Sequence, residues 1–387
     1  MRAVAAAAVI ALAVTACNGV SQVDGSAPVT ITGGFQRDDG SPAANIPVAL
    51  AKELGAAEAF EGMFTVFSFG TLCLVDEPPD ICRERGQVTR TGDGGSYRLG
   101  LSGRDTQSFL GFASTLAVSG ALPAPDGAQA GPATTLRFAV HGEEVILPSV
   151  RLWQAVPTTA SRAGHLQVDW PNPPGWMGRV ERVRLLFESP TGIAVWTQAA
   201  ANTPAVVDLR LLEDFPSGVV VQADGEASVP NLTVDVAYRT VQLAVRGAGP
   251  APSRGATCTV TDHQGTRVVS PCALTDGDLE SMLAPPVPAP GEPPAPPPPP
   301  GAEGAGPAET VILDLGSVAP RTLAVLRGDP VGMTVELSAD GQHWGAPVHV
   351  SGERPAVAAR LPRADARYVR ITSPAGPIAR LTEASIW

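Results

Sequence analysis

The sequence contains a single lysine, Lys52, and no run of basic residues in its 387 positions. Its formal net charge is −11 at pH 7. Proteins that bind nucleic acid need clustered cations to neutralise phosphates, so this composition argues against a nucleic-acid partner. Long stretches rich in Leu, Glu, Lys and Ala are also missing, whereas Val, Thr, Gly and Pro recur throughout. We therefore expect an all-β chain of short strands joined by turns.

Signatures of the common catalytic sites are missing as well. The sequence has no G-x-S-x-G, no H-E-x-x-H, no Walker loop and no Rossmann fingerprint. Its five histidines are scattered. His141, which precedes Glu143 and Glu144, has the spacing of a turn rather than that of a helical metal site. We expect a protein that is not an enzyme and that requires no cofactor for activity.

The first 17 residues have the pattern of an export signal. Arg2 precedes an apolar run from Ala3 to Val14, which is too short to span a bilayer as a stable anchor. The tetrapeptide VTAC, which ends at Cys17, resembles a bacterial lipobox. The resemblance implies a lipoprotein signal over residues 1–17, an acylated Cys17 at the mature N-terminus and a tether over 18–27. The alternative is an ordinary secretory signal with a chance cysteine.

Acylation of Cys17 implies an exported protein whose lipid binds it stably to the membrane. We expect attachment to the bacterial cell envelope, at the outer membrane or the cell surface.

Four cysteines remain once Cys17 is set aside, and they form two pairs that are local in sequence, Cys73 with Cys82 and Cys258 with Cys272. Zinc ligands are expected at closer spacing and with nearby histidines. In an exported protein, two disulfides that close short loops are the simpler interpretation.

Residues 28–153 alternate short strand patterns with glycine-containing turns. VTIT at 29–32 is followed by the turn DDGSP and the strand IPVAL at 46–50, and the turn GDGG at 92–95 leads into SYRL at 96–99. Glycine after aspartate supplies the positive φ that a tight hairpin needs. This order of strands and turns resembles the carboxypeptidase regulatory-like (transthyretin-like) β-sandwich, which implies an accessory fold without catalytic residues of its own.

Residues 154–236 form a second predicted unit. HLQVDW at 165–170 alternates cleanly and ends in Trp170, and the strand patterns VERVRLLFES at 180–189 and GVVVQADGEA at 218–227 follow. An early strand that ends in tryptophan, with further strands at this spacing, resembles a fibronectin type III sandwich. The resemblance implies that Trp170 packs in the core between the sheets.

Residues 237–387 contain five motifs in order. They are CALTDGDL, TVILDLGSVAPRTLAVLRG, VELSADGQHW, ARYVRITSPAG and ARLTEASIW, and they begin at residues 272, 310, 335, 366 and 379. Together they resemble the discoidin domain, the C-terminal type of coagulation factors five and eight, which implies a galactose-binding-like jelly roll. A proline-rich tract at 285–307 interrupts this pattern, and we expect it to be a solvated insertion because proline removes the donors that a sheet needs.

Within the third motif, the resemblance implies a hairpin turn at Asp340 and Gly341. Trp344 then returns on the next strand and packs, while His343 points to solvent. The Asp, His and Trp side chains are therefore interpreted as a signature of the fold rather than as a catalytic corner.

Discoidin-type carbohydrate-binding modules often hold a calcium ion between loop carbonyls, an aspartate near a D-G-D turn and a glutamate near the last strand. Carried over to this chain, the resemblance implies one structural calcium ion with Asp276, Asp278 and Glu383 as ligands, since Ca²⁺ takes several converging oxygens. The alternative is an Asx turn at Asp276 and a solvated Glu383. Ligands of the family bind to loops at one end of the jelly roll, where Arg254 and His263 are the polar candidates.

Three functions remain open. The first is a lipid-anchored envelope protein that binds a glycan or a protein through its discoidin-like unit. The second is a structural or assembly lipoprotein of an envelope complex with no glycan ligand. The third is an accessory factor for polysaccharide hydrolysis, which would need paired carboxylates. Asp208, Glu213 and Asp214 form the acidic cluster of the middle unit.

Overall fold

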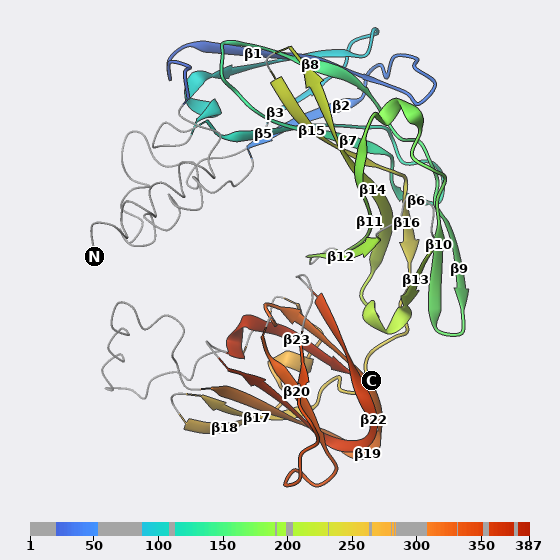
Figure 1. Cartoon of the computed structure of the whole chain (residues 1–387), viewed down its shortest axis with the longest axis vertical. Coiled ribbons are helices and arrows are strands. Elements are labelled where there is room, and N and C mark those ends of the chain that lie inside the picture. Colours follow the sequence, from blue (N-terminus) through green and yellow to red (C-terminus); the bar gives the residue numbers. More distant parts are fainter. Residues whose placement is uncertain are drawn as a thin grey trace.

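A computed structural model describes residues 21–52, 87–107, 113–189, 192–198, 204–230, 232–262, 265–279, 281, 283, 308–330, 332–350, 356–374 and 378–387. Within these ranges the chain consists of β-strands, 3-10 turns and connecting loops, with no α-helix, which confirms the prediction of an all-β chain. Figure 1 shows an arch whose upper end is formed by the first strands and whose lower end is formed by the C-terminal unit. In this part of the chain, no helix has the length and apolar character needed to cross a bilayer.

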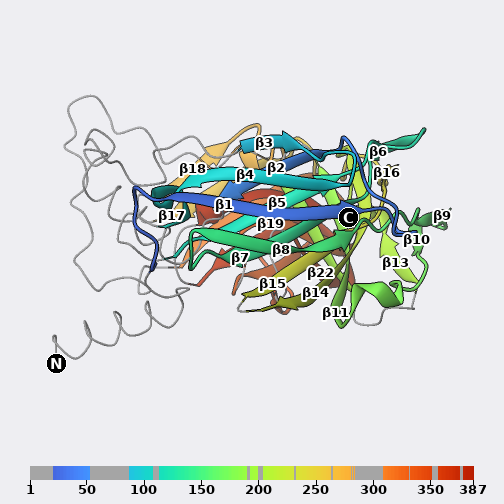
Figure 2. The ribbon, with the colours of Figure 1, turned by 90° about the horizontal axis from the view of Figure 1, so that it is seen from above.

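The upper end of the arch contains a sheet of three strands in the order β4-β1-β8. β1 (Pro28–Gln36) pairs antiparallel with β4 (Ser96–Ser102) and parallel with β8 (Glu144–Arg151), and Figure 2 shows the three strands side by side. Val29 and Ile31 of β1 are buried because alternate side chains of a strand point to the same face.

A ten-stranded sheet forms the second layer and continues down the arch. Its main path is β12 (Gly192–Gln198), β11 (Val180–Ser189), β14 (Ser217–Val229), β15 (Leu232–Arg239), β7 (Ala133–Ala139), β5 (Thr115–Ala121), β2 (Pro47–Lys52) and β3 (Gln87–Arg90). β16 (Gln242–Val245) pairs with β14 and with β6 (Ala128–Ala130).

This large sheet crosses the predicted boundary between the first two units. β7 belongs to the first unit, whereas β15 crosses the predicted boundary between residues 236 and 237, and the two strands pair antiparallel from Asp235↔Arg137 to Arg239↔Ala133. Buried residues from Val23 to Val245 form one hydrophobic cluster, which we call the upper core. The two predicted units therefore share a sheet and a core.

A small third sheet lies beside the upper core, with β10 (His165–Asp169) between β13 (Ala205–Asp208) and β9 (Thr158–Arg162). Trp170 follows β10 directly and packs, partly buried, against the upper core. Trp170, which was predicted to pack in a core between sheets, thus has its side chain against the interior of the upper core.

The C-terminal unit has a seven-stranded sheet and a hydrophobic core of its own. The strands run in the order β18 (Gly265–Val269), β17 (Thr257–Asp262), β19 (Glu309–Gly328), β22 (Ala356–Ser373), β20 (Thr334–Ser338) and β21 (Val348–His349), with β23 (Leu381–Ile386) beside β19. A disulfide joins Cys258 of β17 to Cys272. The predicted sites at Cys17, Cys73, Cys82 and His263 and the proline-rich insertion at 285–307 lie outside the described residues.

The long strand β19 joins the two cores. Leu323 and Val325 pack into the upper core, whereas Ala324 and Leu326, on the opposite face of the strand, belong to the C-terminal core. The last residue, Trp387, also packs against the upper core, and its backbone N–H donates to the carbonyl of Leu323 at 2.9 Å. The C-terminal unit is therefore docked through apolar side chains as well as linked by the chain.

Candidate functional site

A group of buried charges lies where the C-terminal unit meets the turn that follows β13. Glu213 of this turn is 0% exposed and has a φ of +50°. Its carboxylate accepts a hydrogen bond from the Ser385 hydroxyl of β23 and lies 3.4 Å from Nη2 of Arg327. The same Nη2 donates to the carbonyl of Leu211 at 2.6 Å. A buried carboxylate needs such partners because its loss of hydration is otherwise uncompensated.

Arg254 supplies a second cation at this junction. Its Nη2 lies 3.1 Å from Oε2 of Glu213 and 2.9 Å from Oδ1 of Asp214. The guanidinium groups of Arg254 and Arg327 also lie over the ring of Phe215, 5.5 and 5.0 Å from its centroid. We call the following five residues the interdomain cluster: Glu213, Phe215, Arg254, Arg327 and Glu383.

Glu383 of β23 is the second carboxyl group of the interdomain cluster and is 1% exposed. Burial and, secondly, the negative charge of Glu213 raise its pKa to about 8, against the opposing effect of the N–H of Gly277, which donates to Oε2 at 3.1 Å. Burial also lowers the pKa of Arg327, against the opposing effect of Glu213. At neutral pH the junction therefore holds two guanidinium groups and a largely protonated Glu383.

The three predicted calcium ligands do not form one set of donors. Oδ1 of Asp276 accepts hydrogen bonds from the N–H of Asp278 at 2.8 Å and from the hydroxyl of Ser281 at 3.0 Å, as in an Asx turn. Glu383 is buried and accepts a hydrogen bond from the N–H of Gly277. The alternative prediction of a solvated Glu383 is therefore wrong. No three His, Cys, Asp or Glu side chains of the described residues are grouped so that they could hold a metal ion.

Of the two predicted ligand-binding residues, Arg254 and His263, the structure describes Arg254. Its guanidinium is bonded to Glu213 and Asp214 and lies over Phe215, so it belongs to the junction between the units. No local pattern in the sequence predicts that Arg254 contacts Glu213 and Asp214, about forty residues earlier. No motif marks Phe215 as part of a site either.

The acidic cluster of the middle unit has arginine partners. Asp208 accepts hydrogen bonds from Nε and Nη2 of Arg210 at 3.0 and 2.6 Å, and Glu213 is fully buried. Asp214 is bonded to Arg254. These carboxylates do not face each other across an open cleft, which is what a pair of glycosidase carboxylates would require.

The sequence beyond Tyr238 contains three aromatic residues, Trp344, Tyr368 and Trp387. Trp387 packs against the upper core. Trp344 and Tyr368 are half-buried on the sheet of the C-terminal unit. A platform on which a ligand could stack in this unit would therefore use Trp344 or Tyr368.

Trp344 is held against β22 by an arginine. The guanidinium of Arg370 lies 4.3 Å from the centroid of the indole ring, and its Nε and Nη2 each donate to a carboxylate oxygen of Glu336 at 2.7 Å. Glu336 and Arg370 are directly paired in β20 and β22. The bidentate geometry fixes the arginine plane under the indole.

Tyr368, which lies two positions before Arg370 on β22, also packs against an arginine that is bonded to a carboxylate. The guanidinium of Arg367 lies 4.9 Å from the phenol ring, and its Nε and Nη2 donate to the two carboxylate oxygens of Asp314 at 2.7 Å each. These bonds lower the pKa of Asp314 and raise that of Arg367. We call the two groups the outer-face stacks: Trp344–Arg370–Glu336 and Tyr368–Arg367–Asp314.

No motif of the sequence singles out the outer-face stacks. Trp344, which the discoidin resemblance predicts to pack, is half-buried under Arg370. A usable signal was present, since Tyr368 and Arg370 lie two positions apart in a strand and must share the face opposite to the buried Val369 and Ile371.

The hairpin before Trp344 turns around the carboxylate of Asp340. Oδ1 of Asp340 accepts from the N–H groups of Gln342 and His343 at 2.9 and 2.8 Å, and its Oδ2 lies 2.7 Å from Nδ1 of His343. The hydroxyl of Ser338 donates to Asp340 rather than to His343, so no nucleophile is paired with a base. The hydrogen bonds from His343 hold the pKa of Asp340 far below its usual range and raise the pKa of the exposed His343.

No protein-family model matches the chain, and no curated protein matches it. Three similar solved structures are carbohydrate-binding modules or a domain of a carbohydrate-active enzyme. Chitosan-binding module 1 of a chitosanase/glucanase from Paenibacillus sp. IK-5 has 15% identity over 35% of this chain and 98% of the module, with a TM-score of 0.24. A fucose-binding module of Streptococcus pneumoniae has 14% identity over 35% of this chain and 94% of the module, with a TM-score of 0.24. The C-terminal domain of a chitobiase from Bacteroides fragilis has 16% identity over 30% of this chain and 77% of that domain, with a TM-score of 0.21. TM-scores this low carry no conclusion about the ligand of this chain.

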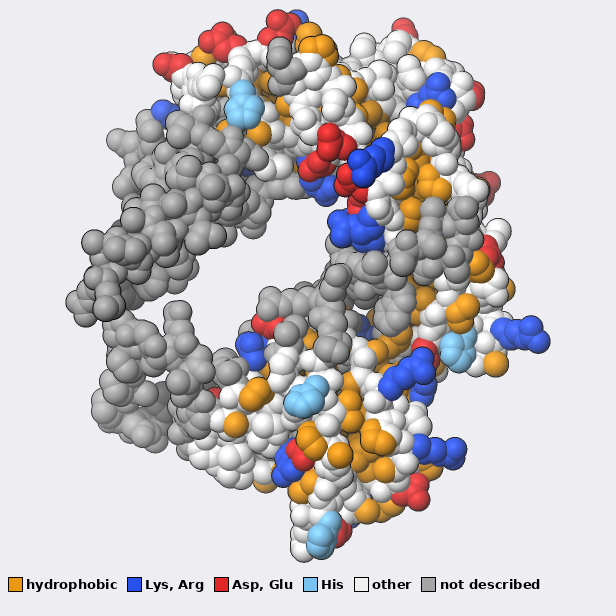
Figure 3. Space-filling model, viewed as in Figure 1, with side chains coloured by type: hydrophobic (Ala, Val, Ile, Leu, Met, Phe, Trp, Pro, Cys, Tyr) orange, Lys and Arg blue, Asp and Glu red, His pale blue; other side chains and the backbone are white. Residues whose placement is uncertain are grey.

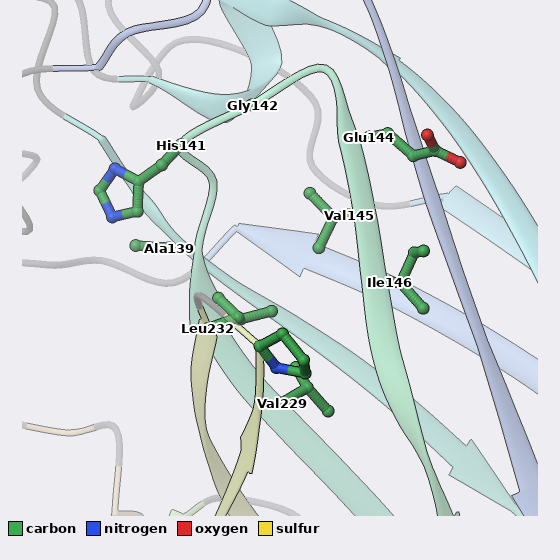
Figure 4. Close-up of a pocket in the computed structure, with 9 residues that line it drawn as sticks. Ala139, His141, Gly142, Glu144, Val145, Ile146, Val229 and Leu232 are labelled. Atoms are coloured by element: carbon green, nitrogen blue, oxygen red, sulfur yellow. The ribbon is translucent and has the colours of Figure 1, made fainter.

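A pocket of about 470 Å³ lies in the upper part of the arch, between β8 and the turn that joins β14 to β15. Figure 4 shows His141 and Glu144 on opposite sides of it, with Val145 and Leu232 between them and Ile146 on the side of Glu144. The imidazole and the carboxylate therefore do not act on a common point. No Trp, Tyr or Phe is among the described residues that line this pocket, so it offers no stacking surface for a sugar.

Figure 3 shows a hollow at the centre of the arch, with acidic and basic side chains gathered on its wall near β11, β14 and β15. These strands carry ion pairs, among them Arg184 with Asp224 at 2.6 Å and Arg239 with Glu188 at 2.5 Å. The arginines of these ion pairs therefore have carboxylate partners within the chain.

Proposed function

We propose that the chain is a non-catalytic protein, anchored to the bacterial cell envelope by a lipid on Cys17, whose discoidin-like C-terminal unit binds a glycan at the outer-face stacks. A protein ligand at the same face is the alternative. The observation that carries the proposal is the placement of Trp344 and Tyr368 on one face of the sheet, each with an arginine that is bonded to a carboxylate.

Sugar rings stack their apolar face on aromatic rings while their hydroxyls bond to planar polar groups. The guanidinium of Arg370 covers one face of the Trp344 ring, and the other face is the one proposed to contact the sugar. Glu336 and Asp314 supply carboxylate oxygens beside the two rings. Because both arginines are already fixed by their carboxylates, little side-chain freedom is lost when a ligand binds.

The test uses the mature full-length chain on a glycan array, followed by calorimetry with the glycans that bind. Trp344→Ala should weaken binding by about fivefold, since loss of a stacking contact costs on the order of 1 kcal/mol. Val268→Ala is the matched control, because Val268 is 70% exposed on β18 of the same unit and lies outside the outer-face stacks. Its affinity should equal that of the wild type.

Binding to no glycan, together with an envelope protein that co-purifies with the wild-type chain, would contradict glycan binding and favour the structural or assembly function. Binding that survives Trp344→Ala would place the ligand elsewhere.

The non-catalytic assignment is supported by the arginine partners of Asp208 and Asp214 and by the burial of Glu213. Purified protein should release no reducing sugar from polysaccharides. Release of sugar that is lost in Asp208→Asn would favour a role in polysaccharide hydrolysis.

The proposed anchor is tested by Cys17→Ser. The wild-type protein should partition into the detergent phase and the membrane fraction, because acyl chains on its N-terminus bind the bilayer. The variant should lose the acyl chains and leave that fraction. A variant that fractionates like the wild type would refute the lipid anchor at this residue.

A further inference from the structure

We propose that Arg254 takes the position in the C-terminal unit where the family resemblance places a calcium ion, and that this internal cation fixes the unit to the middle of the arch. The arginine is supplied by the segment between β16 and β17, which joins the two cores. The inference is independent of glycan binding.

One side of Arg254 contacts the turn that the resemblance assigned to calcium. Gly277 has a φ of +83°, and a Cβ placed on it would lie 1.5 Å from Nη1 of Arg254. The guanidinium therefore rests directly on the backbone of the D-G-D turn. The N–H of Gly277 donates to Glu383, so the turn, the last strand and the arginine meet at one place.

The other side of Arg254 contacts the middle of the arch. Its Nη2 donates to Glu213 and to Asp214, and its guanidinium lies over Phe215. All three partners belong to the turn after β13, which is outside the C-terminal unit. A planar guanidinium carries several N–H donors in fixed directions, so Arg254 can bind both carboxylates of this turn while its Nη1 rests on Gly277 of the C-terminal unit.

A divalent cation does not suit this arrangement. It would lie beside a guanidinium of the same sign, and the carboxylates near it already accept hydrogen bonds: Asp276 from Asp278 and Ser281, and Glu383 from Gly277. Calcium also needs six or more converging oxygens, and no three His, Cys, Asp or Glu side chains of the described residues are grouped to supply part of such a set. The loop is instead held by a cation that is part of the chain and that also reaches the neighbouring unit.

The test measures the melting temperature of the full-length chain in millimolar CaCl₂ and in excess EGTA, and amide hydrogen exchange in residues 209–216 and 381–387. The wild type should melt at the same temperature in both solutions. Arg254→Gln should melt more than about 5 °C lower, because Glu213 and Asp214 lose a cationic partner, and both segments should exchange faster.

Arg267→Gln is the matched control, since Arg267 pairs with Asp262 within the C-terminal unit and away from the junction. It should leave exchange in both segments unchanged. If Arg254→Gln fails to fold, Glu213→Gln removes the opposite partner of the same bond and should raise exchange in residues 381–387.

A wild-type melting temperature that rises in calcium would overturn the inference. So would an Arg254→Gln or Glu213→Gln protein in which both segments exchange at the wild-type rate.

Discussion

Replacing Glu383 by glutamine should remove a loss of stability that the wild-type protein suffers as the pH rises. The pKa of Glu383 is raised from its ordinary value of 4.5 to about 8, chiefly by burial and then by the charge of Glu213. Between these values the folded chain holds a proton that the unfolded chain has released. The free energy of unfolding therefore falls with rising pH across this window, and it does so by about 1.4 kcal/mol per pH unit for one proton.

Over a window of roughly three pH units the total is on the order of 4 kcal/mol. Glutamine keeps an oxygen that can accept from the N–H of Gly277, but it does not ionise. We therefore expect Glu383→Gln to be more stable than the wild type at pH 8, and the advantage should shrink to near zero by about pH 5.

The assay is urea denaturation of the full-length chain at intervals of one pH unit between about pH 5 and pH 8. Glu143→Gln serves as the control because Glu143 is exposed, and its pH dependence should follow that of the wild type. Equal slopes of stability against pH in the wild type and in Glu383→Gln would refute the reasoning, since they would mean that Glu383 does not bind the extra proton.

Three further outcomes follow from the packing of the chain. Gly120→Ala should lower the free energy of unfolding by about 1–3 kcal/mol in urea melts, because its Cβ would lie 2.6 Å from the ring of Phe35; a variant as stable as the wild type would show that the ring can move aside. Replacing both Cys258 and Cys272 by alanine should lower the free energy of unfolding by about 3 kcal/mol, as expected for a disulfide across a sequence separation of 14, and a reducing agent should then shift the melt less than it shifts that of the wild type. Burial raises the pKa of Tyr238 to about 12, so Tyr238→Phe should leave the amplitude of the tyrosinate absorbance below about pH 11 unchanged while the protein is folded.

Much of the C-terminal unit could be predicted from the sequence because its signals are local. Alternation in VELS and YVRI predicts strands with one buried face, and β20 and β22 bury Val335, Val369 and Ile371. The pair Asp340 and Gly341 predicts a turn, and Gly341 has a φ of +76° there. Each of these patterns needs only neighbouring residues, so they can be interpreted without knowledge of the partner strand.

The junction between the units could not be predicted in this way. Glu213 meets Arg327 and Ser385, which lie 114 and 172 positions further along the chain, and no local pattern relates them. Asp276 and Glu383 predict a metal site for the same reason. The sequence does not show that Arg254 lies between the turn at Gly277 and the turn that contains Glu213. Similarly, a strand pattern does not name its partner, and so the pairing of β7 with β15 was not foreseen.

That pairing bears on how the chain can be divided for expression. A fragment that ends at residue 153 would leave the N–H and C=O groups of β7 without partners along the edge that β15 occupies, and free edges of this kind recruit strands from other molecules. A fragment that begins at residue 246 would expose Leu323 and Val325 of β19 to water. Pieces cut at the apparent module boundaries should therefore aggregate more readily than the span 21–387 as a whole.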